Sequence, residues 1–233
     1  MIYEETPSFS LSCPSTDTQR LAIHKTLLDS FSQPTIVANP LLQDQWLPWA
    51  RRCTYAGDHD YAPLAIPGPT LGEIRHSAVK SYSWAIPSHA ALETCVWACG
   101  KSGKVLELGS GTGYWASLLS SYGLDVVAVD NGSETHRDEI FSPHFSDAIK
   151  DDAEMYLIQN DGARDRALFL CWPRDASRWV DLYRGKTVIW IGEEDGCTWE
   201  MDRTDGWEVV RTIRIPSWGL IHDKLVVYKR AAA

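Results

Sequence analysis

A glycine-rich segment and an acidic residue downstream of it are the residues in this sequence best suited to bind a ligand. The segment 107–113 reads Glu-Leu-Gly-Ser-Gly-Thr-Gly, and Asp130 ends the apolar run 126–129. Alternating glycines let backbone N–H groups approach a ligand closely at the start of a helix. A carboxylate at the end of the neighbouring strand can accept hydrogen bonds from ribose hydroxyls. The pattern therefore predicts a site for a nucleoside-like cofactor.

The same glycines leave the kind of nucleoside open. Gly111, Gly113 and Ala116 fit the dinucleotide fingerprint loosely, in which glycines permit a tight turn and close packing of strand on helix. On the residues alone, a nucleotide-dependent oxidoreductase that uses NAD or FAD is an alternative.

The elements that must position this site follow from the hydrophobic pattern after residue 88. Short apolar runs, typical of buried strands, alternate with helical segments at 105–108, 126–129, 167–171 and 187–191. Such alternation predicts an α/β fold with a mostly parallel, Rossmann-like sheet and helices on both faces. The last two strands, 207–215 and 224–229, are joined by a loop too short for a helical crossover. They should form an antiparallel hairpin at the sheet edge.

Proline usage divides the chain near residue 88. Nine of the 12 prolines precede this residue, whereas the glycine-bearing periodic segments follow it. We therefore expect an N-terminal helical and proline-rich lid, 1–87, and a cofactor-binding domain, 88–233. A dimerisation arm is the alternative role for the N-terminal segment.

Three local expectations are less regular than the rest. Asn39-Pro40 predicts the start of a helix that Pro48 ends. The stretch 61–72 contains three prolines and two glycines and is expected to be irregular. A third strand of the sheet, expected around 145–150, has only a weak pattern.

The glycine-rich segment and the terminal hairpin resemble those of a known family. The segment 107–113 is similar to the acidic-x-Gly-x-Gly-x-Gly signature of class I S-adenosylmethionine-dependent methyltransferases, and the terminal hairpin resembles the one that distinguishes their sheet from a dinucleotide fold. The resemblance covers about residues 88 to 230. It implies an enzyme that transfers a methyl group from S-adenosylmethionine and releases S-adenosylhomocysteine.

The resemblance also implies roles for individual residues. The glycine turn would meet the methionine part of the cofactor, Asp130 would hold the ribose, and Asp152-Ala153 would lie near the adenine. The full set of candidates for cofactor binding is Glu107, Gly109, Gly111, Gly113, Asp130, Asp152, Ala153, Cys171 and Trp84.

One motif departs from the family pattern. Cys171-Trp172-Pro173 stands where many amino methyltransferases carry an Asn/Asp-Pro-Pro-aromatic motif beside the transferred methyl group, and Arg174 replaces the second proline. Several phrases, such as Tyr82-Ser-Trp-Ala-Ile-Pro, resemble a bacterial and fungal subgroup of methyltransferase-like proteins. That subgroup implies no particular substrate, and transfer to nitrogen or to oxygen stays open.

Aromatic residues are the second feature that bears on chemistry, because the chain has 11 tryptophans. Methyl transfer from a sulfonium needs a dry pocket that holds the nucleophile close to the methyl carbon. Aromatic faces suit this task because each attracts a cation by about 0.5–2 kcal/mol. Among the aromatic residues in expected loops, Tyr82, Trp172 and Trp218 are the candidates for substrate binding.

Proton removal has two candidate residues, His222 and Glu193. Both should lie on or near the pocket side of the sheet, where a general base would act. The plainer alternatives are a structural role for His222 and a solvated acidic loop around Glu193. The histidines show no metal-ligand spacing, so we expect no metal.

Composition bounds the partners and the compartment. The net charge of −9 and the absence of a basic run argue against a nucleic-acid partner and are compatible with a cationic small-molecule substrate. Six cysteines without a CxxC pair, and no long apolar run, favour a cytoplasmic protein away from the membrane. We expect a monomer or homodimer. A methyltransferase-like protein that binds the cofactor without turnover is the non-enzymatic alternative.

Overall fold

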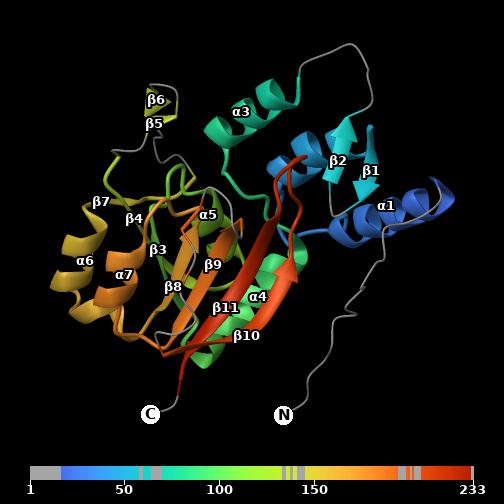
Figure 1. The fold of residues 1–233 in the computed structure, drawn as a ribbon. Coiled ribbons are helices and arrows are strands. Elements are labelled where there is room, and N and C mark those ends of the chain that lie inside the picture. The colour runs from blue at the N-terminus through green and yellow to red at the C-terminus, as the bar shows by residue number, and fades with distance from the viewer. Residues whose placement is uncertain are drawn as a thin grey trace.

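The computed structural model describes residues 17–57, 60–63, 70–132, 135–136, 139–140, 145–193, 198–199, 201 and 206–231. A seven-stranded sheet in the order β10-β11-β9-β8-β3-β4-β7 forms its centre (Figure 1). The strands are β3 (Lys104–Leu108), β4 (Asp125–Asp130), β7 (Ile149–Lys150), β8 (Ala167–Cys171), β9 (Thr187–Glu193), β10 (Trp207–Arg214) and β11 (Asp223–Arg230).

Strand directions confirm the predicted sheet. Neighbours from β7 through β9 pair in parallel, whereas β11 pairs antiparallel with both β9 and β10. The C-terminal hairpin thus adds its first strand at the sheet edge and its second strand beside β9. The central strands are buried on both faces, which explains their continuous apolar sequences.

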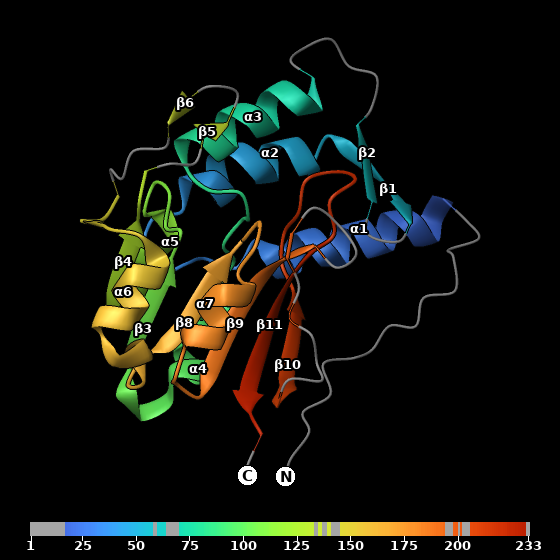
Figure 2. The same cartoon turned by 60° about the vertical axis from the view of Figure 1, so that its left-hand side comes forward.

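Helices cover both faces of the sheet, as the sequence predicts (Figures 1 and 2). The helices α4 (His89–Cys99) and α5 (Tyr114–Ser121) pack in one hydrophobic cluster with alternate strand residues such as Phe169 and Ile189. The helices α6 (Ala153–Gln159) and α7 (Ser177–Leu182) lie against the cluster formed by the intervening residues, such as Leu168 and Val188. Because successive side chains of a strand point to opposite faces of the sheet, each strand contributes residues to both hydrophobic cores.

The N-terminal part is more regular than its sequence indicates. It contains α1 (Asp17–Phe31), η1 (Leu41–Trp46), α2 (Leu47–Ala50), β1 (Cys53–Gly57), β2 (Asp60–Pro63) and α3 (Leu71–Ser81). The short elements of the remaining chain are η2 (Gly100–Ser102), β5 (Thr135–His136), β6 (Glu139–Ile140) and η3 (Asp161–Ala163). No helix among the described residues is both long and apolar enough to cross a membrane.

Three local expectations need correction. Pro48 does not end a helix, because the backbone stays helical from η1 into α2 through Trp46 and Leu47, with Pro48 in the first turn of α2. The stretch 61–72 is not wholly irregular: β2 pairs with β1 as far as Pro63, and a capping box on Thr70 starts α3. Residues 64–69 lie outside the described part. Only Ile149 and Lys150 of the expected third strand pair in the sheet.

The N-terminal elements share the core of the sheet domain rather than packing separately. The side chains of Leu41 and Trp46 are fully buried in the same cluster as α4 and α5. The Asn39 amide donates to the Pro87 carbonyl (2.8 Å), and the Trp46 indole N–H donates to the Ser217 carbonyl (2.8 Å). Figure 2 shows α2 and α3 above the ends of the strands. The division predicted near residue 88 thus runs through a continuous core.

We expect Trp218→Ala to lower the free energy of unfolding by about 3–5 kcal/mol, the usual cost of removing a buried large aromatic side chain. Trp218 is 0% exposed, and its ring centroid lies 5.3 Å from that of Trp49. The matched control is Trp97→Ala, because Trp97 is 50% exposed on α4 and should contribute about 1 kcal/mol or less. Urea unfolding measures both. Equal losses would contradict the packing role of Trp218.

Candidate active site

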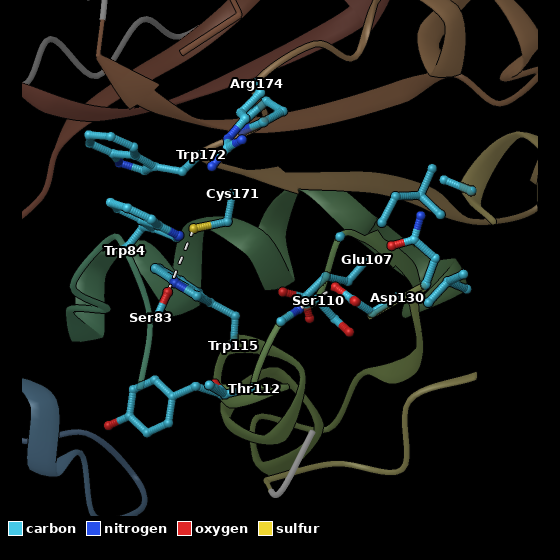
Figure 3. Close-up of a pocket in the computed structure, with 18 of the residues that line it drawn as sticks. Ser83, Trp84, Glu107, Ser110, Thr112, Trp115, Asp130, Cys171, Trp172 and Arg174 are labelled. Carbon is cyan, nitrogen blue, oxygen red and sulfur yellow. Dashed lines mark hydrogen bonds between the residues drawn. The ribbon is translucent and has the colours of Figure 1, made fainter. Parts of the chain in front are cut away.

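A cavity of about 390 Å³ opens where several parallel strands end. Residues that follow β3, β4 and β8 form its walls, together with Tyr82, Ser83 and Trp84 from the loop after α3 (Figure 3). Ligands of open α/β sheets bind at the carboxyl ends of the strands, and cavities of this size are typical of small-molecule sites. The cavity is therefore the candidate ligand pocket.

The glycine turn forms one wall of this pocket. Gly109 and Gly111 have positive φ angles of 71° and 53°, which glycine adopts at little cost. A Cβ on Gly111 would meet no atom within 4 Å, so the missing side chain leaves open space. Gly113 has a different role: it precedes α5 with φ 76° and packs against Ser146 instead of lining the pocket.

Asp130 joins the glycine turn to the end of β4. Its Oδ2 accepts a hydrogen bond from the Gly111 N–H (2.8 Å), and its Oδ1 accepts one from the Gly132 N–H (2.7 Å). A carboxylate has about four acceptor positions, so two remain for a ligand. Asp130 is half-buried and lines the pocket.

Glu107 is the most unusual polar residue of the pocket. It is only 2% exposed, and its Oε2 has no hydrogen-bond partner among the described residues. Burial raises the pKa of Glu107 to about 8; a backbone hydrogen bond with Ala116 opposes the rise and the Asp130 charge adds to it. The buried Ser110 hydroxyl also lacks a partner among the described residues. Unpaired buried polar atoms in one cavity indicate a polar ligand.

Asp152 and Ala153 form another wall, at the start of α6. Asp152 caps this helix, because its Oδ1 accepts hydrogen bonds from the N–H groups of Glu154 (3.0 Å) and Met155 (3.2 Å). Both residues line the pocket, as does Asp151. The structure thus brings the expected adenine-side residues to the same cavity as the glycine turn.

The remaining wall is largely aromatic, and the charged residues Arg174 and Asp175 line the cavity next to it. Trp84 and Trp172 stack with ring centroids 5.3 Å apart and planes 13° apart. Cys171 Sγ lies 3.8 Å from Ser83 Oγ. Burial raises the pKa of the Cys171 thiol far above its usual value, so the thiol stays protonated at neutral pH. Tyr82 also lines this wall.

Besides Gly113, three of the predicted site residues lie outside the pocket. Trp218 is buried in the core, as described above. His222 Nδ1 lies 3.7 Å from Glu193 Oε1, and neither residue lines the cavity. The neighbouring residues Glu194 and Asp195 lie outside the described part of the chain.

Several lining residues are absent from the sequence expectations. Ser110 lies within the glycine segment, and Ser83 lies between two predicted aromatic residues, so their neighbours could have indicated both. Trp179 on α7 has the pattern of a core residue, yet its ring lies against Gly109 and lines the pocket. No local signal in the sequence distinguishes that role.

The strand order, with β11 antiparallel beside β9, defines the Rossmann-like fold of class I methyltransferases. The chain is similar to an S-adenosylmethionine-dependent methyltransferase from Archaeoglobus fulgidus, with TM-score 0.43 and 12% identity over 60% of this chain and 92% of that one. It is also similar to magnesium protoporphyrin IX methyltransferase from Synechocystis PCC 6803, solved with bound S-adenosylhomocysteine, with TM-score 0.42 and 13% identity over 89% and 99% of the two chains.

A third similar structure is that of the 23S rRNA methyltransferase ErmE, with TM-score 0.37 and 14% identity over 60% of this chain and 68% of that one. No protein-family model and no curated protein matches the sequence. The likeness is one of fold.

The burial of Glu107 predicts a particular dependence of stability on pH. Its carboxyl ionises near 4.5 in the unfolded chain and near 8 in the folded protein. The folded state therefore holds this proton more tightly, and the resulting stability is present below pH 4.5 and lost as the pH rises through 8. Glu107→Gln lacks this loss. As the pH rises from 5 to 8, the free energy of unfolding of the variant, relative to that of the wild type, should increase by roughly 2–4 kcal/mol.

Urea unfolding at several pH values measures this difference. The control is Glu208→Gln, because Glu208 is exposed on β10 and should show a constant difference from the wild type. A difference for Glu107→Gln that does not change with pH would contradict the buried, neutral carboxyl.

Proposed function

We propose that this protein is an S-adenosylmethionine-dependent methyltransferase that methylates a nitrogen or oxygen atom of a small molecule. The observation that carries the proposal is the buried Glu107 carboxyl, whose Oε2 has no partner among the described residues, beside the open glycine turn and Asp130. A polar, positively charged nucleoside cofactor would satisfy all three features.

The residues present fit this cofactor. Glu107 Oε2 and the Ser110 hydroxyl are polar atoms available to its amino-acid part, and the open space at Gly111 leaves room for it. Asp130 retains acceptor positions for the ribose hydroxyls. Asp152 and Ala153 lie where the adenine would be held.

The mechanism needs little from the protein beyond position and exclusion of water. When bound, the cofactor supplies an electrophilic methyl carbon, and its sulfur keeps the electron pair of the broken bond. Ser83, Trp84, Cys171 and Trp172 form the wall against which the acceptor would be oriented. Confining two reactants in a dry pocket lowers the barrier substantially.

The described residues of this wall provide no strong base. Among the described residues that line the cavity, none is a histidine or a lysine, and the raised pKa of the Cys171 thiol keeps it from acting as one. The acceptor atom would attack with its own lone pair, and its proton would pass to solvent after transfer. His222 and Glu193 stay candidates only for a role outside the cavity.

Two alternatives are weaker. A nucleotide-dependent oxidoreductase would use the same kind of glycine turn, but the antiparallel hairpin and the acid at position 107 favour the methyltransferase. A protein that binds the cofactor without turnover would share the cofactor wall, and only an assay separates it from an enzyme. We propose a small molecule rather than a nucleic acid as substrate because the net charge is −9. We place the protein in the cytoplasm as a monomer or homodimer.

We expect S-adenosylhomocysteine to bind the wild type and to raise its thermal stability, with about 2.7 kcal/mol gained at 100 times the dissociation constant. Asp130→Asn removes the negative charge and replaces one acceptor oxygen with an amide group, so it should weaken S-adenosylhomocysteine binding about 10–100-fold. Asp181→Asn on α7 is the control, because Asp181 is exposed and does not line the cavity. Isothermal titration calorimetry measures the affinity of all three proteins for S-adenosylhomocysteine.

The outcomes separate the alternatives. Binding of NAD or FAD without binding of S-adenosylhomocysteine would refute the proposal in favour of the oxidoreductase. A search of metabolite extracts for a methylated product, with S-adenosylmethionine as methyl donor, then distinguishes an enzyme from a silent binding protein.

A further inference from the structure

Two tryptophans from distant parts of the chain form one aromatic surface of the pocket. Trp84 follows α3 in the N-terminal segment, and Trp172 follows β8 in the sheet domain (Figure 3). Their planes are 13° apart, so they stack almost in parallel, and each ring keeps part of its surface open. This arrangement, the Trp84–Trp172 pair, needs an explanation beyond core packing because both residues line the cavity.

The conformation of Trp172 is imposed by its surroundings. Its φ angle is 55°, a region that bulky residues rarely adopt. Its backbone N–H donates to the Ile191 carbonyl (2.8 Å), and its indole N–H donates to Asp223 Oδ1 (2.7 Å). Asp223 is only 5% exposed, and its Oδ2 has no hydrogen-bond partner among the described residues. Such strain persists where the structure holds a residue for function.

A positive charge already lies beside the pair. The guanidinium carbon of Arg75, on α3, is 5.3 Å from the ring centroid of Trp84 and 5.3 Å from that of Trp172. Arg75 also interacts electrostatically with Asp223. A second cation stacked on these rings would be repelled by Arg75, whereas a neutral ring would not.

We propose that the Trp84–Trp172 pair binds the methyl acceptor by stacking, so that the acceptor is a planar aromatic or heteroaromatic small molecule without a positive charge, and that Asp223 is the positioning residue for Trp172. This inference rests on the proposed function. It replaces the cationic substrate suggested by net charge with a class defined at the site. Ser83 and Cys171 on this wall are uncharged and suit such a ring, and Arg174, which also lines the cavity, is a second positive charge that disfavours a cationic acceptor.

Matched probes test the planarity of the acceptor. 2-Naphthol and its saturated counterpart, decahydro-2-naphthol, have similar size and no charge, but only the first is flat and aromatic. With S-adenosylhomocysteine at saturation, calorimetry should show 2-naphthol binding about tenfold more tightly. Quinoline should likewise bind more tightly than N-methylquinolinium, its cationic counterpart.

Variants assign the effect to the pair. Trp172→Leu should weaken 2-naphthol binding about tenfold and leave decahydro-2-naphthol binding within about twofold, whereas Trp172→Phe should retain most of the preference. Trp97→Leu is the matched control, because this exposed tryptophan on α4 lies outside the cavity. Loss of the preference in the control as well would overturn the assignment.

Two variants of Asp223 test its positioning role. Asp223→Asn keeps an oxygen that can accept from the Trp172 indole and should retain 2-naphthol binding within about twofold. Asp223→Leu removes that acceptor and should weaken binding as much as Trp172→Leu does. If Asp223→Leu does not fold, Asp223→Ser, whose shorter side chain cannot reach the indole, replaces it. A folded variant without the acceptor that binds 2-naphthol normally would overturn the role.

Different results would refute the proposed function and the stacking of the acceptor on the Trp84–Trp172 pair. A wild-type protein that does not bind S-adenosylhomocysteine refutes the proposed function itself. A wild type that binds S-adenosylhomocysteine but shows equal affinity for the flat and saturated probes, or prefers the cationic ring, overturns this inference alone.

Discussion

The two hydrogen bonds that Asp130 accepts, from Gly111 and from Gly132, tie together the loops that follow neighbouring strands. The bond from Gly111 forms because β3 and β4 run parallel with Leu108 opposite Val129, so that both strands end at the same level, whereas the bond from Gly132 is local to the loop after β4. The Val129 carbonyl accepts from the Gly109 N–H (2.9 Å), which fixes the start of the glycine turn by the same register. The rest of the pocket is arranged around this joint.

In or beside this pocket, two carboxyl groups are buried at positions that lower the stability of the protein. Burial raises the pKa of Glu107 to about 8 and that of Asp223 to about 7, and each residue has one carboxyl oxygen without a hydrogen-bond partner among the described residues. A hydrophobic core of the same shape would be more stable. Unpaired carboxyl groups of this kind are found where a ligand or a positioned side chain uses them. Glu107 lines the pocket, whereas Asp223 accepts the hydrogen bond of the Trp172 indole.

The sequence predicts those features that depend on local pattern. The glycine turn, the acid at position 130 and the mostly parallel sheet with its terminal hairpin follow from glycine geometry, apolar runs and loop length. The placement of Trp218 does not, because the Trp49 ring that covers it comes from an N-terminal helix with no pattern to link the two. The contact between Trp172 and Asp223 joins β8 to β11 across the intervening β9, and residues 51 positions apart leave no local signal.

The N-terminal segment matters because hydrogen bonds anchor it directly on the glycine turn and the helix that follows the turn. The Thr112 hydroxyl, within the glycine turn, donates to the Tyr82 carbonyl, and the Trp115 indole N–H donates to the Ala85 carbonyl (3.3 Å). These bonds flank Trp84 on both sides in sequence, so a shift of the turn would be passed to the aromatic wall. Because closely packed groups move together rather than independently, the glycine turn and the aromatic wall form one mechanical unit. Ordering the turn around a cofactor therefore also orders the surface on which the acceptor would be placed.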